Sequence, residues 1–145
     1  MNLEHVTEIR ASRERVFDYI SNPEKLRLWA KGMEERTDLT PGRHGVGTRF
    51  RQRIREGGRV TEYEGEILAY DPPAHLQVRM ARGPLTMTME YRLSTPSPAV
   101  TQLHQRLSIE SASRIMRWLA PLFSAFTRRL MRRQAQALKE LVEQP

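Results

Sequence analysis

The chain has 145 residues, 39% of them hydrophobic and 28% charged, and it contains no cysteine. These values are typical of a globular protein with a hydrophobic core, and they exclude disulfides, thiolate metal sites and a cysteine nucleophile. No stretch approaches the ~18 apolar residues of a membrane-spanning helix, and Met1–His5 lacks the basic and apolar segments of a signal peptide. We therefore expect one domain over 1–145, located in the cytoplasm.

The net charge is +7, and most of the 24 basic residues are arginine. One interpretation is a negatively charged partner: nucleic acid, an anionic membrane or an acidic ligand. The other is a solvated basic surface with no specific partner. Because the charge is spread along the whole chain and not gathered in a tail, we favour the solvated surface and do not expect nucleic acid.

The N-terminal part of the chain predicts a strand followed by two short helices. Residues 3–9 alternate between apolar and polar side chains, which predicts a strand with His5 on its inward side. Ser12 is a good N-cap for the first helix. Asn22, followed by a proline, begins a second helix that carries Trp29. These two helices connect the first strand to the second.

A glycine pair at 57–58 predicts a tight turn between two strands. Pairing the strands back from this turn places Phe50 opposite Gly65 and Gln52 opposite Tyr63. The same register gathers arginines and glutamates on the other face of the two strands. That face is therefore predicted to be solvated, each ion pair contributing about 0.2–1 kcal/mol.

The remaining alternating segments predict further strands, separated by turns rich in proline and glycine. They lie at 33–39, 76–80, 85–93 and 101–109. Residues 113–142 form the longest helical pattern, with apolar residues along one side and arginines along the other. Pro121 interrupts this pattern, so we expect a short lead-in segment, a candidate lid, before the main helix.

Together these elements predict an α+β fold. It has a curved antiparallel sheet of about seven strands, with the two short helices placed between strands one and two. A sheet with one solvated face needs a cover on the other face. The long C-terminal helix is the only predicted element able to provide that cover.

Four segments in this order resemble the START-like (SRPBCC) superfamily, particularly its polyketide cyclase/dehydrase-like branch. The opening run, 9–29, carries Val-Phe in its first helix, then Asn-Pro-Glu and a tryptophan. The segments 45–50 and 70–76 are similar to the middle strands of that family. The segment 120–141 is similar to its final helix. The resemblance covers essentially the whole chain.

This resemblance implies the helix-grip fold, in which the sheet wraps around the C-terminal helix and leaves a deep cavity between them. It also implies binding of a hydrophobic small molecule. We expect no cofactor. The resemblance implies no single activity, because the superfamily includes lipid and sterol carriers, aromatase/cyclases, quinone-binding proteins and proteins that act on ribosomes. The superfamily has no shared catalytic motif, so the resemblance assigns no catalytic residue.

The strand and helix phases select side chains that would line such a cavity. Most are apolar, and several are methionines, whose flexible side chains suit an adaptable site for a hydrophobic ligand. The alternative is that these side chains only pack as core. The predicted ligand-binding residues are Trp29, Phe50, Gln52, Ile54, Tyr63, Ile67, Met80, Met87, Met89, Tyr91, Leu103, Gln105, Leu107, Leu122 and Phe126.

Chemistry at this face would depend on few groups. Tyr63 and Tyr91 are candidates to polarise a carbonyl during an aldol-type cyclisation, and His5 is a candidate base. No inward pair of carboxylates is predicted for general acid–base catalysis. The histidines do not show the spacing of metal ligands, so no metal site is expected.

Three functions remain open for this sequence. They are a cyclase/dehydrase of polyketide-like substrates, a non-catalytic carrier of a lipid or quinone, and a basic module that contacts RNA, the ribosome or an anionic membrane. For the last function, the apolar side of the C-terminal helix is expected to be needed by the sheet, so membrane insertion would compete with folding. We expect a monomer or a homodimer.

Overall fold

The computed structural model describes residues 1–145, apart from the side chain of Glu56. It contains one antiparallel sheet with the strand order β1-β7-β6-β5-β4-β3-β2. The strands are β1 (Asn2–Ile9), β2 (Met33–Asp38), β3 (Arg49–Glu56), β4 (Arg59–Asp71), β5 (His75–Arg82), β6 (Leu85–Ser97) and β7 (Val100–Ser111). The predicted α+β fold with a seven-stranded antiparallel sheet is therefore confirmed.

Four helices accompany this sheet: α1 (Arg13–Ser21), α2 (Pro23–Trp29), α3 (Arg114–Trp118) and α4 (Ala120–Val142). Both predicted caps are present. The Ser12 side chain accepts a hydrogen bond from the Arg15 amide, and the Asn22 side chain accepts one from the Glu24 amide. The division predicted at Pro121 is also confirmed, because α3 ends before Leu119 and α4 begins after it.

The β3–β4 hairpin has the predicted register. Phe50 pairs with Gly65, and Gln52 pairs with Tyr63. The charged face of the hairpin forms as expected. Arg49 lies 3.5 Å from Glu66, its directly opposite residue, but two other arginines reach different partners. Arg51 lies 3.5 Å from Glu62, and Arg53 lies 3.7 Å from Glu35 of β2, because long side chains reach diagonal neighbours and the next strand.

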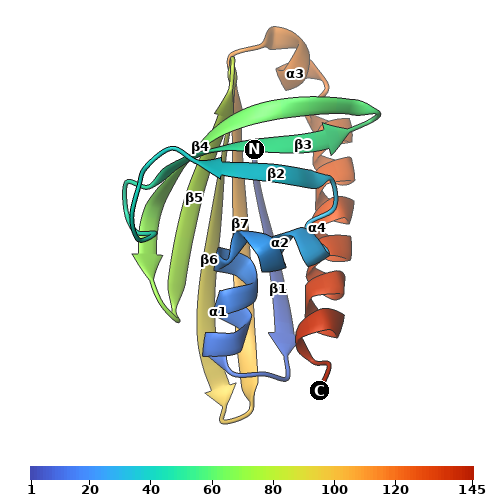
Figure 1. The fold of residues 1–145 in the computed structure, drawn as a ribbon. Coiled ribbons are helices and arrows are strands. Elements are labelled where there is room, and N and C mark those ends of the chain that lie inside the picture. Colours follow the sequence, from blue (N-terminus) through green and yellow to red (C-terminus); the bar gives the residue numbers. More distant parts are fainter.

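The sheet is strongly curved. Figure 1 shows β2 and β3 running across the direction of β1 and β7, so the sheet encloses an inner face. Register shifts occur in β2 between Met33 and Glu35 and in β4 between Ile67 and Ala69. Irregularities of this kind bend a strand and increase its twist. We call the concave side of the sheet the inner face.

The helix α4 packs along β1, but on a different side from the one predicted. Its buried residues are Thr127, Met131, Ala135, Leu138 and Val142. The predicted inward residues Leu122 and Phe126 are 74% and 66% exposed. The predicted orientation of these two side chains is therefore wrong. Leu122 and Met131 are about two and a half turns apart, which places them on opposite sides of the helix.

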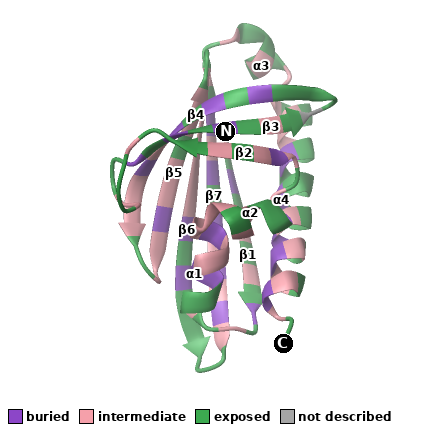
Figure 2. Cartoon of the chain, in the orientation of Figure 1, coloured by how far each residue is buried: buried purple, intermediate pink, exposed green. Residues whose placement is uncertain are grey.

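The core has two parts. The larger part joins α1, α2 and the C-terminal half of α4 to the sheet, and it includes Trp29, whose indole Nε1 donates to the Tyr19 carbonyl at 2.9 Å. The smaller part joins Met131 of α4 to Leu3, Leu107 and Ile109. Figure 2 shows buried residues concentrated on the lower half of α4 and on the strands behind it. The upper half of α4 and all of α3 are largely uncovered.

None of the described helices is long and apolar enough to cross a membrane.

Candidate functional site

The inner face of the sheet has an apolar middle. Residues that pair directly across neighbouring strands share a face, so the pairing defines rows of side chains. One row runs Gly65, Met80, Met87 and Ile109, and the next runs Ile67, Val78, Met89, Leu107 and Leu3. The three methionines are half-buried, whereas Ile67 and Leu107 are buried. The predicted methionine-rich surface is thus assembled on one face.

A polar row borders this middle on each side. The first row consists of Arg36, Gln52 and Tyr63, from β2, β3 and β4. The second row contains Tyr91, Gln105 and His5, from β6, β7 and β1. Gln52, Tyr63, Tyr91 and Gln105 are all buried, in agreement with their predicted inward orientation.

Arg36 is the inner-face residue that sequence reasoning missed. Its guanidinium carbon lies 3.8 Å from the centroid of the Phe50 ring, and its side chain is only 8% exposed. Strict alternation from Met33 would place residue 36 on the outer face. The register shift between Met33 and Glu35 reverses that phase and turns Arg36 inward. A bulge of this kind leaves no clear signal in the sequence.

The guanidinium of Arg36 is incompletely paired. Its Nε lies 3.6 Å from Asp38 Oδ1, beyond hydrogen-bond distance, and Asp38 Oδ2 is held by His44 Nε2 at 2.9 Å. Burial lowers the pKa of Arg36, and the nearby Asp38 carboxylate partly offsets that effect. Nε and Nη2 are buried and make no hydrogen bond. These two donors lie on the edge of the guanidinium that can hold a carboxylate with two bonds.

Two more inner-face residues have a buried polar atom that makes no hydrogen bond. Gln105 Oε1 and Thr7 Oγ1 are buried without a hydrogen-bond partner. Thr7 pairs with Leu103 of β7, and Gln105 pairs with Tyr91 of β6, so both belong to the inner face. Among the described residues, every buried side-chain polar atom without a partner therefore lies on this one face. Such atoms each cost about 1–3 kcal/mol relative to a hydrogen-bonded state.

The candidate catalytic residues are spread over the inner face. Tyr63 and Tyr91 lie three rows apart, which corresponds to about 20 Å along the strands. His5 and Tyr91 share a row, but Gln105 stands between them, so their strands are about 10 Å apart. The two apolar rows thus separate Tyr63 from Tyr91 and His5 along the inner face.

The pKa values of two of these residues, Tyr91 and His5, are shifted from their ordinary values. Burial raises the pKa of Tyr91 well above its ordinary range, so its hydroxyl remains protonated and can donate or accept a hydrogen bond. Burial and the positive charge of Arg132 lower the pKa of His5. His5 is consequently neutral near pH 7, the form in which imidazole can accept a proton.

The remaining predicted residues fall into three groups. Phe50 and Leu103 are buried on the inner face, and Ile54 is half-buried next to Thr61. Trp29 is 2% exposed within the larger core, so it contributes to packing. Leu122 and Phe126 lie away from the inner face, as described above.

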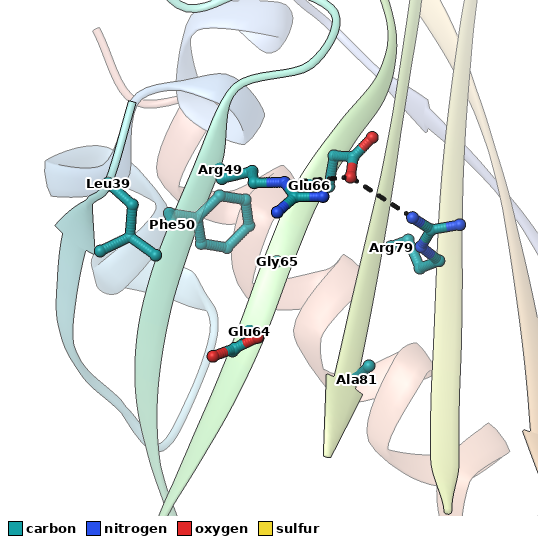
Figure 3. A pocket seen from close by; sticks show the side chains of 8 residues that line it. All are labelled: Leu39, Arg49, Phe50, Glu64, Gly65, Glu66, Arg79 and Ala81. Atoms are coloured by element: carbon teal, nitrogen blue, oxygen red, sulfur yellow. Dashed lines mark hydrogen bonds and ion pairs between the residues drawn. The ribbon is translucent and has the colours of Figure 1, made fainter. Parts of the chain in front are cut away.

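One surface hollow lies elsewhere on the sheet. It has a volume of about 260 Å³ and is lined largely by outer-face residues, including Arg49, Glu66 and Arg79 (Figure 3). Glu66 lies 3.5 Å from Arg49 and 3.4 Å from Arg79. The Glu66 carboxylate is already paired with both arginines, so the hollow is a poor candidate for a ligand site. The described residues contain no cluster of metal-binding side chains.

The sequence profile of one protein family, described as polyketide cyclase/dehydrase and lipid transport, matches residues 1–143. The chain belongs to this family. The resemblance to the START-like superfamily noted from the sequence is thereby confirmed. No curated protein matches the sequence of this family member.

Solved structures support the same fold for this cyclase/dehydrase and lipid transport family member. A protein from Thermus thermophilus has a TM-score of 0.78 at 19% identity, covering 98% of this chain and 97% of its own. An aromatase/cyclase from Streptomyces sp. R1128 has a TM-score of 0.76 at 15% identity, covering 99% and 93%. Norcoclaurine synthase from Thalictrum flavum has a TM-score of 0.72 at 17% identity, covering 100% and 87%.

Proposed function

We propose that this chain binds a hydrophobic small molecule that carries at least one hydrogen-bonding oxygen, on the inner face of the sheet. One observation carries this proposal. The buried polar atoms without partners, in Arg36, Gln105 and Thr7, all lie on that face. A ligand oxygen or hydroxyl placed there would recover the hydrogen bonds that the protein itself does not make.

The two kinds of row suggest how such a ligand would lie. Its apolar body would contact Ile67, Met80, Met87, Met89 and Leu107, where flexible thioethers adapt to irregular shapes. A carbonyl, phenolate or carboxylate at one end would accept from Arg36, beside Gln52 and Tyr63. A second polar group would meet Tyr91 and Gln105.

The alternative function is a non-catalytic carrier of a lipid or quinone. The separation of the candidate catalytic groups favours this alternative. Tyr63 is separated from Tyr91 and His5 by the two apolar rows of the inner face. A cyclase/dehydrase acting on polyketide-like substrates would then use only one polar row, with neutral His5 as base and the Tyr91 hydroxyl as donor. Turnover that survives Tyr91→Phe, once a substrate is known, would contradict that catalytic assignment.

Arg36→Met tests the binding proposal. Replacing an incompletely paired buried cation with an apolar side chain of similar length should leave the unfolding free energy unchanged or raise it. Affinity for an acidic apolar probe, cis-parinaric acid, should fall at least about tenfold, because a charge-assisted pair contributes about 1.5–3 kcal/mol. Fluorescence titration measures the affinity, and urea unfolding measures the stability.

Arg53→Met is the matched control, because Arg53 is an exposed arginine on the outer face of β3. It should change neither quantity appreciably. Native mass spectrometry after mild extraction provides an independent test, since the wild-type chain should carry a co-purified apolar molecule. Equal probe affinity in both variants, or no bound molecule and no probe binding, would contradict the proposal.

A further inference from the structure

A second surface stands apart from the inner face. Four large apolar side chains on α3 and on the first half of α4 are at least 66% exposed. Ile115 and Trp118 are 70% and 82% exposed, and Leu122 and Phe126 are 74% and 66% exposed. Side chains four residues apart on a helix lie on the same side, so Leu122 and Phe126 form one stripe. We call these four residues, together with Arg129 and Arg133, the basic–aromatic face.

The charge of this face has a single sign. Residues 111–139 contain no aspartate or glutamate. Arginine occupies positions 114, 117, 128, 129, 132 and 133 of the same stretch. In the part of the chain that the structure describes, none of these six arginines is within ion-pair distance of a carboxylate, whereas most arginines of the sheet are paired.

Arginine and apolar side chains are interleaved on α4. With a rotation of about 100° per residue, Arg129 and Arg133 fall in the same arc as Leu122 and Phe126. This arc is opposite the buried side that contains Met131. Contact through the basic–aromatic face would therefore leave the packing of α4 against β1 intact, and the expected competition between membrane contact and folding does not arise.

Three partners could be considered for such a face. A second copy of the chain would bring two unpaired positive surfaces together in a symmetric contact, which is unfavourable. Nucleic acid would neutralise the arginines, but it would leave Ile115 and Leu122 without an apolar environment. An anionic membrane supplies both negative headgroups and an apolar boundary layer.

We propose that the basic–aromatic face docks on the surface of an anionic lipid membrane. Trp118, Leu122 and Phe126 enter the boundary between headgroups and acyl chains, and the arginines contact lipid phosphates while their stems lie along the apolar layer. The helix lies on the membrane and does not span it. This docking goes beyond the proposed binding of a small molecule and rests on different residues.

Co-sedimentation of the full chain with lipid vesicles tests the proposal. Binding should be strong with vesicles of phosphatidylcholine and phosphatidylserine, weak with phosphatidylcholine alone, and reduced by salt. Leu122→Ser combined with Phe126→Ser should weaken binding at least about tenfold. Arg129→Ser and Arg133→Ser should each weaken it about fivefold, as expected from about 1 kcal/mol per basic residue at an anionic surface.

The tryptophans provide an internal probe. Trp118 is exposed and Trp29 is buried, so a blue shift of the fluorescence on vesicle addition should arise from Trp118 and be lost in Trp118→Phe. Val6→Ser and Arg53→Ser are controls, because both alter exposed residues on the outer face of the sheet. Both variants should bind vesicles like the wild-type chain.

Each result has a defined meaning. Equal binding to both kinds of vesicle, no binding to either, or unchanged binding in the Leu122→Ser/Phe126→Ser variant would overturn the proposal. Salt-sensitive binding to RNA without vesicle binding would overturn it in favour of nucleic acid. Unfolding curves establish that the variants are folded. Binding of cis-parinaric acid in the absence of vesicles reports separately on the inner face, so the two proposals can fail independently.

Discussion

Three residues on neighbouring strands form a stack at the edge of the inner face. The Cζ and Cε atoms of Phe50 occupy the space that a side chain at Gly65 would need, and the Arg36 guanidinium carbon lies 3.8 Å from the centroid of that ring. A Cβ atom added at Gly65 would be 2.2 Å from Cζ of Phe50. The absence of a side chain at 65 is thus what allows the Phe50 ring to take this position next to Arg36.

Gly65→Ala should lower the unfolding free energy by about 1–3 kcal/mol, the usual cost of overpacking. The ring of Phe50 must move, and Arg36 must move with it, so affinity for cis-parinaric acid should fall as well. Urea unfolding and fluorescence titration measure the two effects. Gly45→Ala is the control, because a Cβ there meets nothing within 4 Å. A Gly65→Ala variant as stable as the Gly45→Ala variant would contradict this description of the stack.

Sequence reasoning predicted part of this stack. The glycine pair at the hairpin turn placed Phe50 opposite Gly65 and Gln52 opposite Tyr63, because a short turn fixes the register of its strands. It did not predict Arg36, because a register shift in β2 depends on how the edge strand follows a curved neighbour. The position of a polar residue on such a strand is a tertiary property.

Among the elements, α4 shows how an apolar pattern can indicate a helix and still give the wrong buried side. The side of α4 predicted to face the sheet was chosen largely because it contains Leu122 and Phe126, which are large apolar side chains in the N-terminal half. The observed side uses smaller residues, Thr127 and Ala135, next to β1. The C-terminal half, where Leu138 and Val142 are buried, sets the rotation of the whole helix.

A pair of leucine variants tests the orientation of α4. Leu138→Ala should lower the unfolding free energy by about 2–5 kcal/mol, since that side chain is fully buried and its removal leaves a cavity. Leu122→Ala should change it by less than about 0.5 kcal/mol, because Leu122 is exposed. Thermal or urea unfolding of both variants gives the comparison. Similar losses in the two variants would show that both sides of α4 are buried in solution.

At the scale of the whole molecule, three titratable groups couple stability to pH. Burial and Arg132 lower the pKa of His5. For Glu90, hydrogen bonds from His75 and Arg92 outweigh the opposing effect of burial and lower the pKa. The Arg10 amide and Lys139 lower the pKa of Glu143. In each case the unfolded chain binds its proton at a higher pH than the folded chain does.

Stability should therefore fall with decreasing pH in two steps, because protons bind more tightly to the unfolded state. The first step lies below the ordinary histidine pKa of 6.5, and the second lies below the ordinary glutamate pKa of 4.5. Urea unfolding at a series of pH values measures both steps. His5→Gln should remove most of the first step and leave the second. A first step that persists in His5→Gln would assign it to another histidine.

The overall architecture could be predicted from the sequence to a greater extent than the site. Alternation, caps and turns are local signals, and they specified the strands, both short helices and the break at Pro121. The two polar rows bring together side chains from strands that are distant in sequence, and their unsatisfied atoms become evident only in three dimensions. The same holds for the uncovered apolar side of α3 and α4.

The strand order has a consequence for the order of folding. The strands β2 to β7 form a continuous meander of neighbours, whereas β1 pairs with β7, with Glu4 opposite Arg106. Closing a loop of this length costs about 4 kcal/mol of chain entropy, so we expect this pairing to form after the local hairpins. Because α4 packs on β1, the first strand and the last helix should become ordered together. The inner face would thus be completed in the final stage of folding. A ligand bound there should therefore slow the first stage of unfolding, in which β1 and α4 separate from the sheet.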